Sequence, residues 1–173
     1  MNSDNETKSP SLLLSSQTEE LDFDNQLTVT PLSTSYHLCG KVIHGFKRGS
    51  KLLGCPTANL DPICFKDGQL PTNFEEGVYC GFASINKGTI YKTVLSIGLN
   101  PTFQTKERTV EAHLLYEFED DFYDQELTLI IVGFLRKQED FSNISELIKW
   151  IQRDIRISAK WLQKENSNLI KIN

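Results

Sequence analysis

Residues 77–98 read GVYCGFASINKGTIYKTVLSIG, and this stretch decides the fold class. Two segments within it, Val78 to Asn86 and Thr89 to Ile97, are rich in the β-branched and aromatic residues that favour strands. Only the short connection Asn86-Lys87-Gly88 separates them, and Asn and Gly suit the tight turns of hairpins. The stretch therefore predicts a β-hairpin.

Strand patterns continue on both sides of this hairpin. Leu38 to His44 alternates in residue type ahead of it, and residues 109–118, TVEAHLLYEF, place apolar side chains at every second position. Glu111 and His113 therefore share the mostly polar face of the later strand. Leu127 to Leu135, LTLIIVGFL, is apolar on both faces, so we expect this strand to be covered on both sides.

A late helix is the expected cover. Asn143 can cap its start, and Glu146 stands three residues later, as in a capping box. Strands joined by turns and followed by one helix predict a mainly β fold, an antiparallel sheet closed or half-closed into a small barrel with the helix packed against it. The predicted apolar stripe of the helix has members at steps of three and four, namely Ile144, Leu147, Ile148, Ile151, Ile155, Ala159 and Leu162.

Composition narrows the class of protein. The chain has 173 residues, enough for one domain with its own core, and 39% of them are apolar and 24% charged. The formal net charge of −5 argues against a nucleic-acid partner. No apolar run approaches the roughly 18 residues of a membrane span, so no membrane partner is expected. The four cysteines form no C-x-x-C pair, which argues against a zinc ribbon and favours buried or idle thiols.

Residues 1–35 are polar and acidic. Their low hydrophobicity predicts a largely disordered tail ahead of a barrel domain over residues 36–173. The tail resembles neither a secretory signal nor an Arg-rich transit peptide, so we expect the protein to be cytoplasmic. Deletion of residues 1–35 is expected to change activity little.

The segment from His44 to Leu60, HGFKRGSKLLGCPTANL, concentrates glycines and basic residues. It is not a Walker phosphate loop, because three residues instead of four separate Gly45 from Gly49, and Pro56 forbids the continuous helix that such a loop opens. Glycines that admit backbone N–H groups, together with basic residues such as Lys51, still suit a phosphate cradle. An ordinary solvated basic loop would explain the same composition.

Thr57 and Asn59 follow the proline at alternating positions. In an extended segment their hydroxyl and amide oxygens would lie on one side of the backbone. Neutral oxygens of this kind, with phosphate oxygens and water, suit Mg²⁺. A turn stabilised by the Asn or Thr side chain is the alternative explanation.

Taken together, these segments resemble the riboflavin kinases (flavokinases). The Gly-rich segment and its Pro-Thr-Ala-Asn motif are followed, in family order, by GVYCGFASI, VLSIGLNPTF, TVEAHLL, DFYDQELTLIIVGFLR and ISELIKWIQRD. The blocks cover about residues 39–162. The resemblance implies a six-stranded antiparallel Greek-key β-barrel with a C-terminal α-helix packed against it, in agreement with the periodicities.

The resemblance also implies a reaction, in which riboflavin and ATP give FMN and ADP. Gly45 and Lys51 would hold the ATP phosphates, while Thr57 and Asn59 would bind ATP together with its Mg²⁺. Glu111 would be the catalytic base, because a carboxylate can take the proton of the ribityl hydroxyl that attacks the γ-phosphate. By its position alone, Glu111 would be a solvent-facing strand residue.

Two further residues concern the flavin. Arg136 matches the family's Leu-Arg motif, whose arginine lies in the segment that closes over the flavin, although a strand-end salt bridge would also explain it. Phe141 is expected to wall the isoalloxazine ring, or else to pack at the entrance of the helix. The chain departs from the family at Asp124, where relatives commonly have Gly, and at Gln138, where many have Glu.

We expect a monofunctional kinase that acts as a monomer on riboflavin and ATP. A catalytically silent flavin- or nucleotide-binding barrel would share the fold, but it would bind riboflavin without forming ADP. A kinase of the same architecture that acts on another small alcohol, or that takes its phosphate from CTP, is the third hypothesis.

Overall fold

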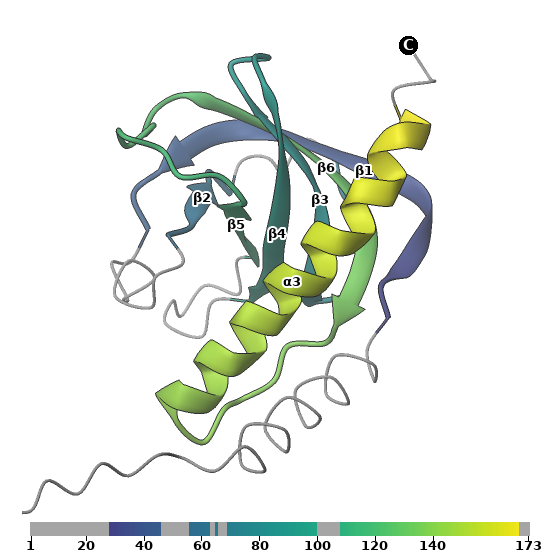
Figure 1. Cartoon of the computed structure of the whole chain (residues 1–173). Coiled ribbons are helices and arrows are strands. Elements are labelled where there is room, and N and C mark those ends of the chain that lie inside the picture. Colours follow the sequence, from purple (N-terminus) through teal and green to yellow (C-terminus); the bar gives the residue numbers. More distant parts are fainter. Residues whose placement is uncertain (1–27, 46–55, 63–64, 66–68, 100–107, 170–173) are drawn as a thin grey trace, which may run out of the picture.

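The computed structural model describes residues 28–45, 56–62, 65, 69–99 and 108–169. Within these ranges the strands form a closed barrel in the order β1-β2-β5-β4-β3-β6, and each strand pairs with antiparallel neighbours. A long C-terminal helix crosses the outside of the barrel (Figure 1). The elements are β1 (Thr30–Ile43), β2 (Ala58–Leu60), β3 (Gly77–Ile85), β4 (Ile90–Leu99), β5 (Arg108–Leu114), β6 (Glu126–Arg136) and α3 (Ile144–Leu169).

The order of the strands is that of a Greek key. β3, β4 and β5 follow one another in the sheet, and β6 returns to lie beside β3, which gives the spatial order β6-β3-β4-β5. β1 then closes the ring, because it pairs with β6 on one side and with β2 on the other. The predicted six-stranded barrel with one C-terminal helix is confirmed.

The hairpin between β3 and β4 is the predicted one. Asn86 and Lys87 adopt φ values of 49° and 57°, and the N–H of Gly88 donates to the carbonyl of Ile85 over 2.9 Å. Two successive positive φ values define the turn that matches the right-handed twist of paired strands.

β1 starts earlier than predicted. The first strand was expected at Leu38, but it begins at Thr30, so residues 30–35, which were assigned to the tail, belong to the barrel. A register shift lies between Pro31 and Tyr36, where the strand crosses β6. Nearly all side chains of residues 30–35 are exposed, so this part of β1 is held by backbone pairing with β6. For the same reason its sequence shows no apolar alternation that would predict a strand.

β5 is shorter than predicted. It ends at Leu114 rather than Phe118, because the chain turns where the N–H of Tyr116 donates to the carbonyl of Leu114 over 2.8 Å. The aromatic ring of Phe118 then packs against those of Tyr91 and Phe122. The apolar positions Tyr116 and Phe118, which extended the predicted strand, therefore belong to an aromatic cluster beyond its end.

The acidic turn before β6 tolerates the departure at Asp124. This residue has a φ of 62°, a conformation that Gly adopts freely and Asp accepts at a modest cost. Its N–H donates to the carbonyl of Val42 over 2.8 Å, which ties the turn to the end of β1.

Two apolar cores lie on either side of the strands. The barrel interior includes Leu38, Leu95, Val110 and Leu129, all almost fully buried. A second core fills the space between the outside of the barrel and α3, with members Val29, Val78, Cys80, Phe82, Val94, Leu135 and Leu162. β6 contributes to both, since Ile131 faces the interior while Ile130 and Val132 pack in the outer core. The predicted cover on both faces of this strand is confirmed.

Two cysteines lie in the described part of the chain. Cys39 and Cys80 are both free thiols, and burial raises the pKa of Cys80 to about 12. Cys80 is therefore protonated and unreactive at neutral pH. Cys55 and Cys64 lie outside the described residues.

The helix begins as predicted. The N–H of Glu146 donates to Oδ1 of Asn143 over 2.9 Å, which is the cap expected from the sequence. The carboxylate of Glu146 accepts from the hydroxyl and the N–H of Ser142, at 2.8 and 3.3 Å. No helix in the described part of the chain combines the length and the apolar composition that a membrane crossing requires.

The buried side of α3 differs from the predicted apolar stripe. Ile144 is 67% exposed, whereas the buried positions are Arg153, Asp154, Ser158 and Leu162. The prediction is thus correct at Leu162 and wrong at the start of the stripe. Hydrophobic periodicity could not find this side, because an ion pair with the end of β6 holds a charged residue of the helix inside.

Candidate active site

The candidate residues lie in one row across neighbouring strands. Asn59 of β2 stands opposite Glu111 of β5, and Glu111 stands opposite Ser96 of β4. Directly opposed residues of antiparallel strands share a face of the sheet. Their chain neighbours, such as Ala58 and Ala112, are buried in the barrel core, so this row lies on the outer face.

Thr57 joins this row by a side-chain contact. Its hydroxyl donates to Oε2 of Glu111 at 3.4 Å, and both side chains are half-buried. The ring nitrogen Nδ1 of His113 donates to the carbonyl of Pro56 over 2.8 Å, which holds the segment before Thr57 against β5. His113 is therefore a hydrogen-bonding neighbour of this segment, while the candidate base contacts a candidate ligand of the metal.

Gly45 lies against the side chain of Asn59. A Cβ added at Gly45 would stand only 2.8 Å from Cγ of Asn59, closer than real Cβ atoms approach. Absence of a side chain at Gly45 thus lets the chain just after β1 approach the Asn59 amide. The structure brings together four of the predicted site residues, namely Gly45, Thr57, Asn59 and Glu111.

Lys51 lies outside the described residues, so its role in phosphate binding stays a prediction. Within the described residues, no group of three or more His, Cys, Asp or Glu side chains is placed to hold a metal ion. The donors available beside Glu111 are the Thr57 hydroxyl and the Asn59 amide. This neutral set fits a hard divalent cation that completes its coordination with phosphate oxygens and water.

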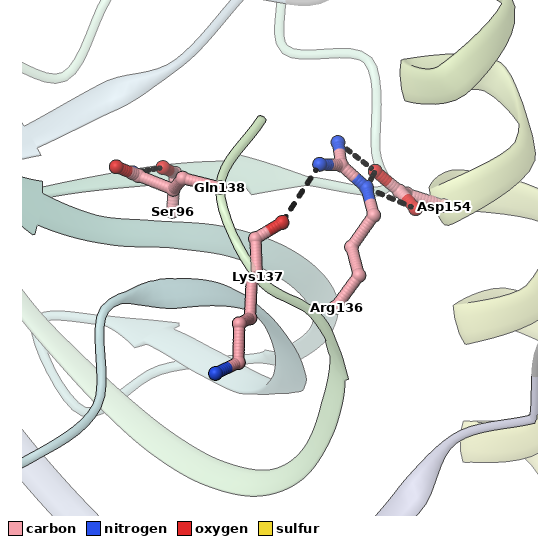
Figure 2. A network of polar contacts seen from close by, with 5 residues as sticks. All are labelled: Ser96, Arg136, Lys137, Gln138 and Asp154. Atoms are coloured by element: carbon pink, nitrogen blue, oxygen red, sulfur yellow. Dashed lines mark hydrogen bonds and ion pairs between the residues drawn. The ribbon is translucent and has the colours of Figure 1, made fainter. Parts of the chain in front are cut away.

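Arg136 ends β6 in a buried ion pair with α3. Its Nε donates to both carboxylate oxygens of Asp154, at 3.2 and 3.0 Å, and its Nη2 donates to Oδ2 at 2.8 Å (Figure 2). Only 8% of the Arg136 side chain and 4% of the Asp154 side chain are exposed. The guanidinium carbon also lies 5.2 Å from the Trp150 ring and 5.6 Å from the Phe141 ring. The two residues predicted to contact the flavin are therefore neighbours.

Burial and pairing have opposite effects on Asp154. Burial raises the pKa of its carboxyl above the usual range, and the hydrogen bonds and charge of Arg136 offset part of the rise. The strand-end salt bridge considered for Arg136 is present. A contact between Arg136 and flavin stays a prediction, as does the role of Phe141.

Several residues of the site were not singled out by the sequence patterns. Asp154 was missed because it is charged, and Trp150 because it lies outside the aliphatic stripe that was considered. A signal existed in the spacing of three and four along Trp150, Asp154, Ile157 and Trp161, which follows one side of a helix. Ser96 carried no signal, since its importance comes from the register of β4 with β5.

Gln138 lies close to this row as well. Its side-chain amide donates to the hydroxyl of Ser96 over 2.8 Å (Figure 2). Between the two anchors, the carbonyl of Lys137 accepts from Nη1 of Arg136 at 3.2 Å. The segment after β6 is thus fixed both to the helix and to β4.

Comparisons with known proteins indicate the family of the chain. The family model described as "Flavokinase: Riboflavin kinase" matches residues 32–162. The chain is 41% identical over 128 residues to the riboflavin kinase of Homo sapiens, covering 74% of this chain and 81% of that protein. It is 44% identical over 139 residues to the bifunctional riboflavin kinase/FMN phosphatase of Arabidopsis thaliana, covering 80% of this chain and 35% of that protein. The chain therefore spans only about a third of the length of the plant protein.

A solved structure supports the same assignment. The crystal structure of riboflavin kinase from Trypanosoma brucei superposes with a TM-score of 0.59 at 27% sequence identity, covering 78% of this chain and 85% of that one. The barrel fold, the family model over residues 32–162 and the similarity to curated riboflavin kinases lead to the same conclusion. The chain belongs to the riboflavin kinase family.

Proposed function

We propose that the chain transfers the γ-phosphate of ATP to the 5′-hydroxyl of riboflavin, giving FMN and ADP. The observation that carries the proposal is the contact of Thr57 with Glu111 at 3.4 Å, with Asn59 opposite Glu111 in the sheet. This contact joins a carboxylate to the Pro-Thr-Ala-Asn motif in a chain of the riboflavin kinase family. Phosphoryl transfer depends mainly on positioning and charge neutralisation, which such an arrangement can supply.

Glu111 acts as the base in this mechanism. Its carboxylate accepts the proton of the 5′-hydroxyl as the hydroxyl oxygen attacks the γ-phosphorus. A new O–P bond forms on the ribityl chain, the bond between the γ-phosphorus and the bridging oxygen breaks, and ADP leaves. The Thr57 hydroxyl, which donates to Oε2 of Glu111, restricts the orientation of this carboxylate.

Thr57 and Asn59 hold the divalent metal, which we propose to be Mg²⁺. When bound, the metal neutralises negative charge on the transferred phosphate. Gly45 leaves the space that the Asn59 amide occupies. Lys51 adds positive charge at the phosphates. Neutral ligands suit a metal that arrives with the nucleotide, because the phosphates already supply the anionic oxygens.

Arg136 and Phe141 form part of the flavin site in this proposal. Phe141 offers an aromatic face to the isoalloxazine ring, and Arg136 stays paired with Asp154 while the small exposed part of its side chain borders the flavin. We further propose that the protein acts as a cytoplasmic monomer. The measurement for the oligomeric state is light scattering on the purified full chain.

The first experiment is incubation of the purified chain with riboflavin, ATP and Mg²⁺, followed by chromatography of the flavins. FMN that forms only when ATP is present supports the proposal, and a parallel arm with CTP identifies the donor. Saturable quenching of riboflavin fluorescence without FMN from any donor or divalent metal would replace the kinase with a silent binding barrel.

A further inference from the structure

Gln138 makes a contact that the proposed mechanism does not use. Its amide nitrogen donates to Oγ of Ser96, the residue directly opposite Glu111 in the ladder between β4 and β5. Gln138 itself is exposed and directly follows β6. Its side chain reaches β4, a strand with which β6 does not pair. A single hydrogen bond thus connects Gln138, which lies outside the strands, to the row of residues that contains Glu111, the candidate base.

The surface of β4 accommodates this contact. A Cβ added at Gly98 would lie 2.6 Å from Cδ of Gln138, so the amide occupies the space that a side chain would otherwise fill. Gly98 lies two residues after Ser96 and therefore on the same face of the strand. The sequence of β4 leaves room for the Gln138 side chain beside the hydroxyl that it contacts.

The other end of the segment is anchored independently. Arg136 is held by the carboxylate of Asp154 on α3, as the dashed contacts of Figure 2 show. Only Lys137 stands between the two anchors, so Gln138 has little freedom once Arg136 is in place. The ion pair with the helix therefore directs Gln138 toward β4.

We propose that Gln138 is a positioning residue for Glu111, acting through Ser96. Because the amide of Gln138 donates the observed bond, the Ser96 hydroxyl keeps its own hydrogen to offer to the Glu111 carboxylate, its neighbour across the ladder. Glu111 is then oriented from two sides, by Thr57 and by Ser96. This inference rests on the proposed function, in which Glu111 is the base.

The test compares variants of the full chain that differ in single groups. Ser96→Thr keeps the hydroxyl, whereas Ser96→Val gives a side chain of nearly the same shape as that threonine without the hydroxyl, so the pair isolates the hydroxyl. Gln138→Ala removes the donor, and Lys137→Ala changes the adjacent residue, whose side chain pairs with the exposed Glu75. The measurements are kcat, the KM for ATP, the KM for riboflavin and the melting temperature.

We expect Gln138→Ala and Ser96→Val each to lower kcat by about tenfold, a loss typical of a catalytic group that is slightly misplaced. Ser96→Thr and Lys137→Ala should stay within about twofold of the parent chain, and the KM for ATP should not change. The double variant that combines Gln138→Ala with Ser96→Val should lose no more than either single variant, because both substitutions break the same link.

Three kinetic results on their own would overturn the inference while the parent chain makes FMN. They are an unchanged kcat in Gln138→Ala, equal rates for the Val and Thr variants at position 96, and multiplicative losses in the double variant. A fall in kcat that follows the melting temperature and also appears in Lys137→Ala would overturn it too, since the contact would then be structural only. Absence of FMN from the parent chain would instead overturn the proposed function.

Discussion

Glu111 has surroundings that an ordinary solvent-facing strand glutamate lacks. Its carboxylate accepts a hydrogen bond from Thr57, and its neighbours in the sheet are Asn59 and Ser96. We expect Glu111→Gln to lower kcat by about 10² or more while riboflavin binding is largely kept, because the amide cannot take a proton. Single-turnover kinetics and fluorescence titration measure the two effects. Glu117→Gln, which removes the same charge at an exposed position nearby, is the control.

Gly45 matters because the Asn59 side chain lies directly against it. A methyl group at this position would collide with the Asn59 side chain, so Gly45→Ala should displace the amide. We expect the KM for ATP to rise by about tenfold, the effect of a ligand that must be repositioned. The riboflavin affinity should stay the same. If ATP binds to this variant as tightly as to the parent chain, the space left by Gly45 does not matter for the nucleotide.

Site residues could be predicted where local sequence sets their geometry. Thr57 and Asn59 were expected on one side of an extended segment, and in the structure Thr57 contacts Glu111 while Asn59 stands opposite it. Ser96 could not be predicted in the same way, because its position beside Glu111 follows from the register of two strands. Assignment of Glu111 as a base came from the resemblance, since a polar strand position alone carries no chemistry.

At the scale of elements, α3 is attached to the barrel by a buried charge pair as well as by apolar packing. Removal of one partner leaves the other charged group buried, and we expect Asp154→Ala to lower the free energy of unfolding by about 3 kcal/mol. Urea denaturation of the purified chain measures this change. Breaking the exposed pair of Lys137 and Glu75 with Glu75→Gln should cost less than about 1 kcal/mol. Similar losses for the two variants would contradict the structural role of Asp154.

The elements that sequence patterns predicted best are those with local signals. The hairpin of β3 and β4 has Asn86 and Lys87 at the centre of its turn and Gly88 directly after them, and the start of α3 has the Asn143 cap. The buried side of α3 was predicted incorrectly at Ile144, because the periodic method counts apolar side chains and ignores ion pairs. The early start of β1 at Thr30 was missed for a related reason, since its first residues are exposed.

At the scale of the whole molecule, residues 28–35 matter more than the predicted tail implied. Val29 is only 7% exposed in the outer core, and Thr30 pairs with Phe134 in the closing ladder. We expect a chain lacking residues 1–35 to be less stable than one lacking residues 1–27 by about 2 kcal/mol, the worth of burying a side chain such as valine. Thermal and urea unfolding of the two truncated chains measure the difference. Equal stabilities would mean that the start of β1 adds nothing to the barrel.

A closed or half-closed barrel was predicted from consecutive strands, but its complete strand order was not. β2 is only three residues long and has no pattern of its own, so its place between β1 and β5 depends on contacts that are distant in sequence. The Greek-key strand order was expected from the resemblance to the riboflavin kinases. The register of the strands then places the candidate site residues side by side. Local signals thus predicted the parts, and long-range pairing determined how they meet.

The pairing of β1 with β6 affects how the chain folds while it is being synthesised on the ribosome. β1 leaves the ribosome early, whereas its partner is synthesised roughly a hundred residues later, and such distant contacts slow folding. During this interval the edge of β1 has no β6 to cover it, and an uncovered edge can pair with other chains. The exposed, mostly polar residues at the start of β1, Pro31 among them, make such pairing less favourable until β6 is synthesised.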